Sequence, residues 1–153
     1  MKQLCKSHWA LAAFLLIVAA ARADVVLDWN AIMQATVNSQ PPFPQARFAA
    51  ITQLAVFEAV NAVTRDYQPY LGTITAPASA SPEAAAATAA HDVLKNYFPA
   101  SSALDAALAS SLAAIPNSPA KTAGITVGQA AAAAMIAARA NDGSSPAAFY
   151  LPS

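Results

Sequence analysis

Two uninterrupted alanine runs, at 84–87 and 130–134, constrain the fold of this chain more than any other feature of its sequence. Alanine has the highest helix propensity, so both runs predict helix. Helix-start signals precede them, because Ser81-Pro82 and Ser118-Pro119 place a capping serine before a proline in the first turn. Since alanine side chains are small, we expect these helices to approach their neighbours closely while each buries little area.

Proline-marked loops divide the rest of the chain, and no alternating strand pattern of useful length occurs. The sequence therefore predicts an all-α fold of about five helices. The expected helices cover about 26–38, 44–64, 82–98, 102–115 and 119–141, with the longest loop at 65–80. The broad apolar surface of 44–64 predicts that this helix is the most buried.

Some individual positions carry finer expectations. In the first helix, one apolar side is expected from Val26, Trp29, Met33 and Val37. In the fourth, a single face is traced by Leu104, Leu108, Leu112 and Ile115. Ser102 with Asp105 resembles a capping box, and Gly143 is expected to cap the end of the last helix.

The N-terminus has the order of a secretory signal. Lys2 and Lys6 precede an apolar run from 9 to 21, and Ala21-Arg22-Ala23 offers small residues for cleavage. We expect residues 1–23 to be a signal peptide and 24–153 to form an exported helical domain, either periplasmic or extracellular. The apolar run is shorter than the ~20 residues that cross a bilayer. An uncleaved anchor is the alternative, and no transmembrane span is expected after cleavage.

Charge and cysteine content narrow the classes of function. Cys5 would leave with the signal, so the rest of the chain has no cysteine for disulfides, thiolate catalysis or metal ligation. Residues 24–153 carry five basic and eight acidic side chains with no basic patch, which argues against nucleic acid as a partner.

The supply of catalytic residue types after position 23 is small. His91 is the one histidine there, and Glu58 and Glu83 are the two glutamates, which is too few for a zinc or di-metal carboxylate site. A serine triad would need Asp92 to orient His91, but helical neighbours point about 100° apart. We therefore interpret His91 as a partly exposed helix residue, and we assign no catalytic, cofactor-binding or metal-ligating residue.

Glu58, Asn61 and Arg65 fall on one stripe of the second expected helix. We interpret them as a hydrogen-bonded polar edge that fixes the following loop, and a polar patch facing a site is the alternative. Arg47 lies about 16 Å earlier along the same helix, too far to pair with Glu58. Four aromatic side chains are interpreted as packing residues: Trp29, Phe57, Tyr67 and Tyr70.

A series of short segments carries a family resemblance. They are residues 28–30, 46–47, 57–62, 67–70, 89–94, 97–99, 128 and 138–143. In order and spacing they resemble secreted bacterial members of the vanadium-dependent haloperoxidase and type 2 phosphatidic acid phosphatase superfamily. The resemblance implies the N-terminal scaffold helices of a larger bundle. It also implies that the oxyanion site, which holds vanadate or a phosphate, lies in a later part of the protein.

The motifs that the resemblance implies for that site do not occur in this chain. Neither Lys95 nor Lys121 is followed by Arg-Pro, and no Ser-Gly-His is present. Our first hypothesis is an inactive N-terminal scaffold, truncated before the C-terminal catalytic half that would be its partner. The alternative is a free-standing exported helical protein that binds a partner or self-associates. An independent small enzyme is disfavoured by the supply of residues, and the sequence does not separate halide oxidation from phosphate-ester hydrolysis.

Overall fold

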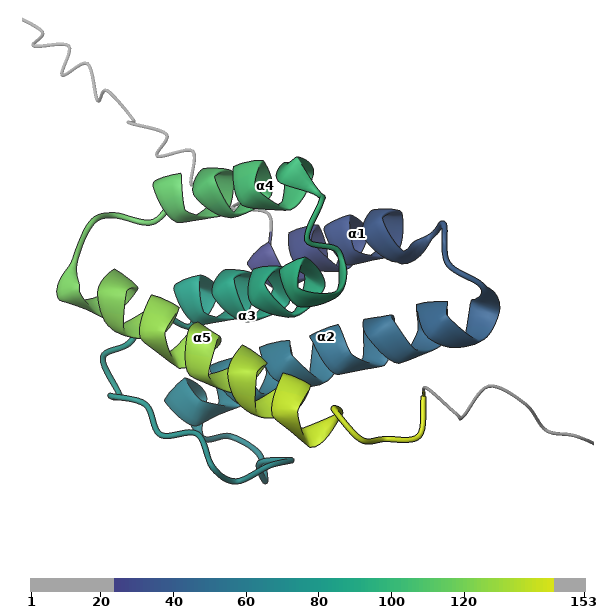
Figure 1. Cartoon of the computed structure of the whole chain (residues 1–153). Coiled ribbons are helices and arrows are strands. Elements are labelled where there is room, and N and C mark those ends of the chain that lie inside the picture. The colour runs from purple at the N-terminus through teal and green to yellow at the C-terminus, as the bar shows by residue number, and fades with distance from the viewer. Residues whose placement is uncertain (1–23, 145–153) are drawn as a thin grey trace, which may run out of the picture.

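The computed structural model describes residues 24–144, and the regular structure in this range is entirely helical (Figure 1). The five helices are α1 (Val25–Val37), α2 (Pro42–Thr64), α3 (Pro82–Tyr97), α4 (Ser102–Ala113) and α5 (Pro119–Ala138). The all-α prediction is confirmed within these residues. The expected signal peptide, 1–23, and the last residues, 145–153, lie outside the described range.

Local capping explains where most of these helices begin. Ser81 Oγ accepts a hydrogen bond from the backbone N–H of Ala84 at 3.1 Å, and Ser118 Oγ accepts one from Lys121 at 3.2 Å. Both predicted start signals are therefore confirmed, with proline in the first turn of each helix. Asp24 caps α1 in the same way, 2.9 Å from the N–H of Val26.

Two other expected caps are wrong. The N-cap of α4 is Ser101, without a side-chain hydrogen bond, and Asp105 turns toward α3 instead of closing a capping box. Helix α5 ends at Ala138, three residues earlier than expected, and Gly143 adopts its positive φ of 78° in the turn beyond it. In both places residues near the expected cap bond to another helix, Asp105 to α3 and Asp142 to Arg47 of α2.

Helix α3 is the centre of the fold. It contacts each of the other four helices, and in Figure 1 it lies between α4 and α2 while α5 crosses in front. Ten of its sixteen residues are buried, against seven of twenty-three in α2, so the expectation that α2 is the most buried helix is wrong. Small alanine side chains allow other helices to pack on every side of α3. The prediction had instead followed the large apolar side chains of α2.

The expected close approach of the alanine-rich helices is confirmed where α3 meets α5. A Cβ atom added at Gly124 would lie 2.3 Å from the carbonyl oxygen of Ser81, and one at Gly128 would lie 2.5 Å from that of Ala85. The backbones also bond directly, since the N–H of Ser81 donates to Ala120 O at 2.9 Å. Glycine is required at both positions because the α3 backbone occupies the space of a side chain.

Larger side chains surround this contact. The fully buried ones include Trp29, Leu94, Leu104 and Met135. Three members of the predicted α1 stripe are buried, namely Trp29, Met33 and Val37. The predicted α4 face is buried only at Leu104, since Leu108, Leu112 and Ile115 keep intermediate exposure.

Among the described residues, α2 is the one helix that is long and apolar enough to cross a membrane by length and composition. We expected no transmembrane span after the signal peptide, and α2 is the segment that bears on this expectation. In the fold, 44% of its most apolar window is buried inside the protein. Core helices of soluble proteins pass the same test, so this finding alone is weak support for a span.

Candidate functional site

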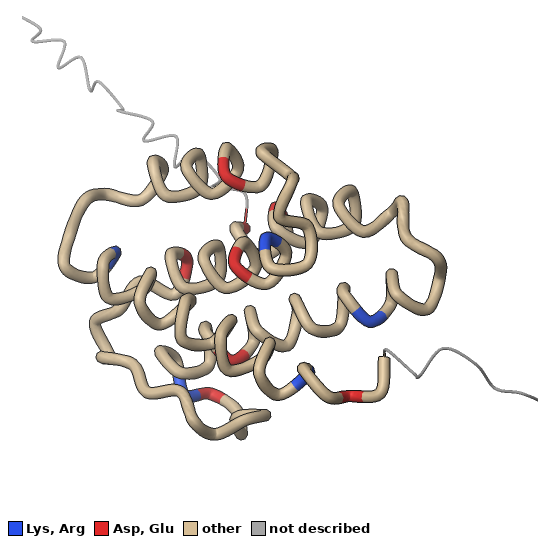
Figure 2. Tube along the Cα trace, viewed as in Figure 1, with Lys and Arg blue, Asp and Glu red and all other residues tan. Residues whose placement is uncertain are grey.

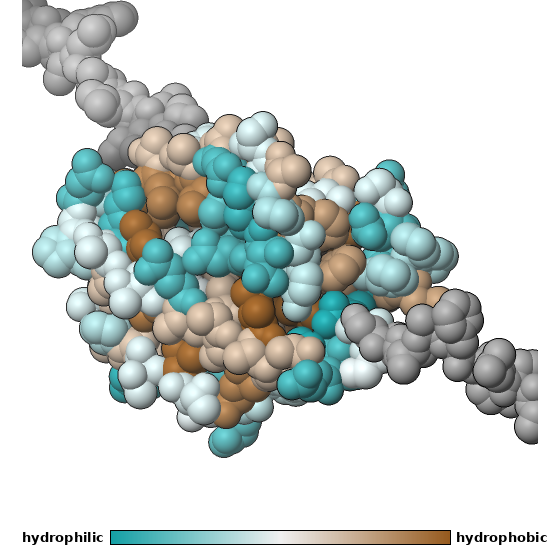
Figure 3. Space-filling view, viewed as in Figure 1, coloured by the Kyte–Doolittle hydropathy of each residue, from teal (hydrophilic) through white to brown (hydrophobic). Residues whose placement is uncertain are grey.

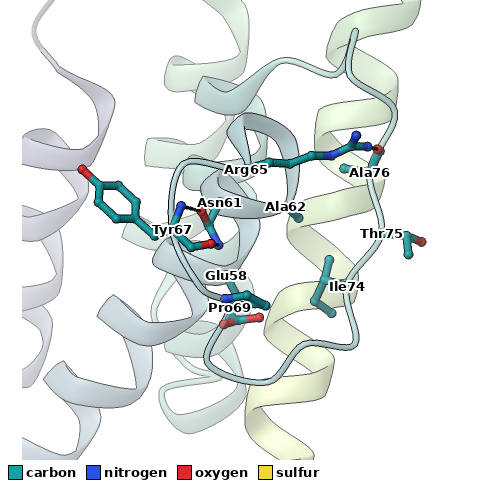
Figure 4. A pocket seen from close by; sticks show the side chains of 9 residues that line it. All are labelled: Glu58, Asn61, Ala62, Arg65, Tyr67, Pro69, Ile74, Thr75 and Ala76. Atoms are coloured by element: carbon teal, nitrogen blue, oxygen red, sulfur yellow. Dashed lines mark hydrogen bonds between the residues drawn. The ribbon is translucent and has the colours of Figure 1, made fainter.

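The C-terminal half of α2 holds the loop 65–80 through a buried carboxylate (Figure 4). The Glu58 side chain is only 2% exposed, and its Oε1 accepts hydrogen bonds from the backbone N–H groups of Tyr70 and Leu71, the latter at 3.0 Å. A carboxylate that accepts two backbone donors is a strong anchor because both bonds are charge-assisted.

Asn61 and Arg65 extend this anchor along the same helix face. The amide of Asn61 bonds twice to the backbone of Tyr67, donating to its carbonyl at 2.8 Å and accepting from its N–H at 2.9 Å. Arg65 ends α2 in a left-handed conformation and donates to the carbonyl of Ala76 at 3.1 Å. The interpretation of this stripe as a polar edge that fixes the following loop is therefore confirmed.

A pocket of about 310 Å³ lies between this edge and the loop (Figure 4). It is lined by Glu58, Asn61, Ala62, Arg65, Tyr67, Pro69, Ile74, Thr75 and Ala76. The lining offers one carboxylate, which already accepts two backbone hydrogen bonds, and neither histidine nor cysteine. Nor do the described residues anywhere bring together three or more histidine, cysteine or acidic side chains able to hold a metal.

Replacing Glu58 with alanine is expected to lower the free energy of unfolding by about 2 kcal/mol, because two backbone donors lose a charged acceptor. Cleavage by a non-specific protease within 65–80 should accelerate in parallel. Glu58→Gln is the matched control, since its amide oxygen can still accept and should recover part of the loss. Equal proteolysis of the wild-type and alanine chains would show that the loop is held by other contacts.

His91 lies in a second polar cluster, where two expectations fail. Its side chain is buried, at 9% exposure for the residue, rather than partly exposed. Asp92 Oδ1 lies 2.7 Å from the ring nitrogen Nδ1, although we expected that a helical neighbour could not reach it. Nδ1 is the ring nitrogen nearer the backbone, and the Asp92 carboxylate bends back to meet it, which an argument from Cβ directions overlooks.

The other ring nitrogen of His91 points to α4. Nε2 lies 3.0 Å from Asp105 Oδ1, while Lys95 Nζ donates to Asp105 Oδ2 at 2.6 Å. The hydrogen bond from Lys95, and next that from His91, lower the pKa of the Asp105 carboxyl. With both ring nitrogens facing carboxylates and no hydroxyl of residues 24–144 bonded to the ring, His91 is not arranged there as a base for a nucleophile. Sequence reasoning missed Asp105 as a partner because it assigned this residue to a cap.

A third polar contact joins α2 to the segment after α5. Arg47 donates from Nε to Asp142 Oδ2 at 2.9 Å and from Nη2 to the carbonyl of Arg139 at 3.2 Å. Its guanidinium also lies over the rings of Phe48 and Tyr97, 5.5 and 5.4 Å from their centroids. These partners are up to 95 positions away, and no local pattern in the sequence indicates them.

Two of the four aromatic residues interpreted as packing residues are exposed. Tyr67 is 72% and Tyr70 52% exposed, because the loop that carries them is held by its backbone rather than by its side chains. The hydroxyl of Tyr70 accepts a hydrogen bond from Arg139, whose guanidinium also lies over the ring. Trp29 is buried as expected, and Phe57 has intermediate exposure.

The ion pair between Arg47 and Asp142 predicts that the stability of the fold depends on pH. The hydrogen bonds from Arg47, and next from Ser144, lower the pKa of Asp142 to about 2. A depressed pKa stabilises the fold above the unfolded value near 4, and this contribution is lost as the pH falls through about 2. Asp142→Asn should therefore be less stable than wild type at pH 6, and most of the difference should be gone at pH 2.

Urea titrations at pH 6, 3 and 2 measure this difference. Asp66→Asn is the control, since it removes the same charge from an exposed loop residue that has no ion-pair partner among residues 24–144. A difference between wild type and Asp142→Asn that stays constant over this range would exclude titration of Asp142 as its cause.

The five basic side chains of the described range are scattered over the fold (Figure 2). Each has a hydrogen-bond acceptor of its own: Asp142 for Arg47, Ala76 O for Arg65, Asp105 for Lys95, Ile115 O for Lys121 and Tyr70 for Arg139. No three of them converge on a common partner in these contacts, as an oxyanion site would require.

Comparisons with protein-family models, with curated proteins and with solved structures found no match to this chain.

Proposed function

We propose that residues 24–144 are a structural scaffold, equivalent to the N-terminal helices of an exported vanadium-dependent haloperoxidase-like or acid phosphatase-like protein. One observation carries the proposal. Residues of the segments that resemble this superfamily contact one another, as Arg47 does with Asp142, Asn61 with Tyr67 and Tyr70 with Arg139. They hold helices and loops together and leave no constellation for chemistry, which is the role of a scaffold.

The engagement of the basic side chains supports the same proposal. Binding a multiply charged oxyanion requires several converging cations and hydrogen-bond donors. Within residues 24–144 every cation is already bonded to a separate acceptor. Vanadate or phosphate would then be held by a catalytic half outside residues 24–144, and that half would be the partner of this scaffold.

Sequencing the DNA downstream of the Ser153 codon tests this proposal. We expect one of the three forward frames to encode an Arg-Pro motif followed by Pro-Ser-Gly-His. Unrelated sequence in all three frames would contradict the proposal that this chain belongs to a longer haloperoxidase-like or phosphatase-like enzyme.

A binding measurement on the chain itself adds an independent test. Titration of the chain into orthovanadate, followed by vanadium-51 NMR, should leave the vanadate linewidth unchanged. Broadening that saturates with protein would show an oxyanion site in this chain and would contradict the scaffold role.

The alternative, a free-standing helical protein acting by partner binding or self-association, is favoured by exposed apolar residues. Phe43 is 90% and Leu27 65% exposed. On the face in Figure 3, however, apolar areas are separated by polar ones rather than forming one patch. A monodisperse chain with cooperative unfolding would favour this alternative, whereas aggregation or a molten state would count against it.

A further inference from the structure

Helix α4 is the least embedded element of the described fold. Its principal neighbour is α3, and Leu104 is its one buried residue. Ala107 and Leu108 add partly buried contacts, and the hydroxyl of Ser111 accepts a hydrogen bond from the Trp29 indole at 3.1 Å. With so little apolar burial, the polar contacts of α4 decide a large share of its attachment.

Two of these polar contacts join Asp105 to α3, one from Lys95 at 2.6 Å and one at the ring of His91. Its ring nitrogens lie 2.7 and 3.0 Å from oxygens of Asp92 and Asp105, and ionised carboxylates only accept hydrogen bonds. Both ring nitrogens must therefore carry a proton for both contacts to be hydrogen bonds. The arrangement fits an imidazolium that joins α3 to α4.

The groups facing this ring come from three helices. Asp92 belongs to α3 and Asp105 to α4, while α1 contributes the uncharged ring of Trp29, perpendicular to the imidazole with 6.2 Å between ring centroids. Lys95 also donates to the carbonyl of Ser101, at the start of α4. Among side-chain types, imidazole is the one that gains or loses a proton between pH 5 and 8, so the protonation of the ring is the variable of this cluster.

We propose that the proton on His91 regulates how firmly α4 is held against α3. When the ring is charged, its Nε2–H donates a charge-assisted bond to Asp105. A neutral ring protonated on Nε2 keeps only the weaker uncharged bond. A neutral ring protonated on Nδ1 turns a lone pair toward the Asp105 carboxylate, so either tautomer loosens α4.

Hydrogen exchange of the full chain at pH 5.5 and 8.0, corrected for intrinsic rates, tests the proposal. Amides of α4 should lose about threefold of their protection at the higher pH, the size expected for a partly exposed charged pair. Amides in the middle of α5 serve as the internal reference and should change little. Side-chain nitrogen NMR at pH 5.5 should find both His91 ring nitrogens protonated, with the signals identified by their loss in His91→Gln.

Two substitutions separate the roles within the cluster. Asp105→Asn should abolish most of the pH dependence in α4, since the charged acceptor is gone. Lys95→Gln should weaken α4 at both pH values yet keep the pH dependence. Equal changes in α4 and α5, or an unaltered pH dependence in Asp105→Asn, would overturn the proposal. The proposal would also be overturned if the protection of α4 amides stayed constant while the His91 ring lost its proton. In that case the ring would have released Asp92 and kept its contact with Asp105.

Discussion

Replacing Trp29 with alanine is expected to lower the free energy of unfolding by about 4 kcal/mol, the largest effect of any single substitution in α1. The indole is 1% exposed, donates to Ser111 Oγ at 3.1 Å and stands edge-on to the His91 ring. Its removal opens a large cavity and leaves the Ser111 hydroxyl without its donor. For a domain stabilised by roughly 5–15 kcal/mol, a loss of this size approaches global unfolding.

Leu27→Ala is the matched control, because Leu27 lies on the opposite side of the same helix and is itself 65% exposed. This control should change stability by less than about 0.5 kcal/mol. Urea unfolding followed by far-UV circular dichroism is the suitable measurement, because tryptophan fluorescence would itself change with the substitution. Similar small losses in both variants would mean that α1 does not pack as the structure has it.

Gly128→Val is expected to cost about 3 kcal/mol, although valine has a higher helix propensity than glycine. A Cβ atom at this position would lie 2.5 Å from Ala85 O, 2.7 Å from Thr88 Cβ and 3.0 Å from Ala89 N. Two of these three atoms belong to the α3 backbone, which cannot turn aside as a flexible side chain would. The helices would have to separate, and neighbouring alanines would lose their contacts as well.

Ala130→Val places the same branched side chain on the exposed face of α5 and controls for its effect on helix propensity. Thermal unfolding should show a midpoint about 10 °C lower for Gly128→Val, at roughly 4 °C per kcal/mol for a domain of this size. The midpoint for Ala130→Val should fall by no more than a few degrees. Equal midpoints for the two variants would contradict the close crossing of α3 and α5.

Sequence signals predicted the features that are set locally. The starts of α3 and α5 follow from Ser81 and Ser118, whose hydroxyls bond within the next turn. The anchoring role of Glu58 and Asn61 follows from their spacing on α2 and the long loop that comes next. In each of these cases the pattern and the contact lie within about a dozen residues.

Features set by distant contacts could not be predicted in this way. Asp105 satisfied a local capping pattern, yet two groups on α3 attract it more strongly than its own helix end does. The pairing of Arg47 with Asp142 spans 95 positions and lies beyond the end of α5. The central place of α3 was hidden for a different reason, because a hydrophobic pattern weights large side chains and alanine registers weakly in it.

The close crossing of α3 and α5 has a consequence for how this sequence can vary. At this crossing the two backbones are in direct contact. Few side chains are therefore available to change rotamer when a neighbouring residue is substituted. A larger side chain on one helix cannot be compensated by a smaller one on the other. Gly124, Gly128 and most of the facing residues of α3 are already glycine or alanine. Tolerated changes along 84–90 should be confined to alanine, glycine and serine, and diversity should accumulate in the loops and in α4.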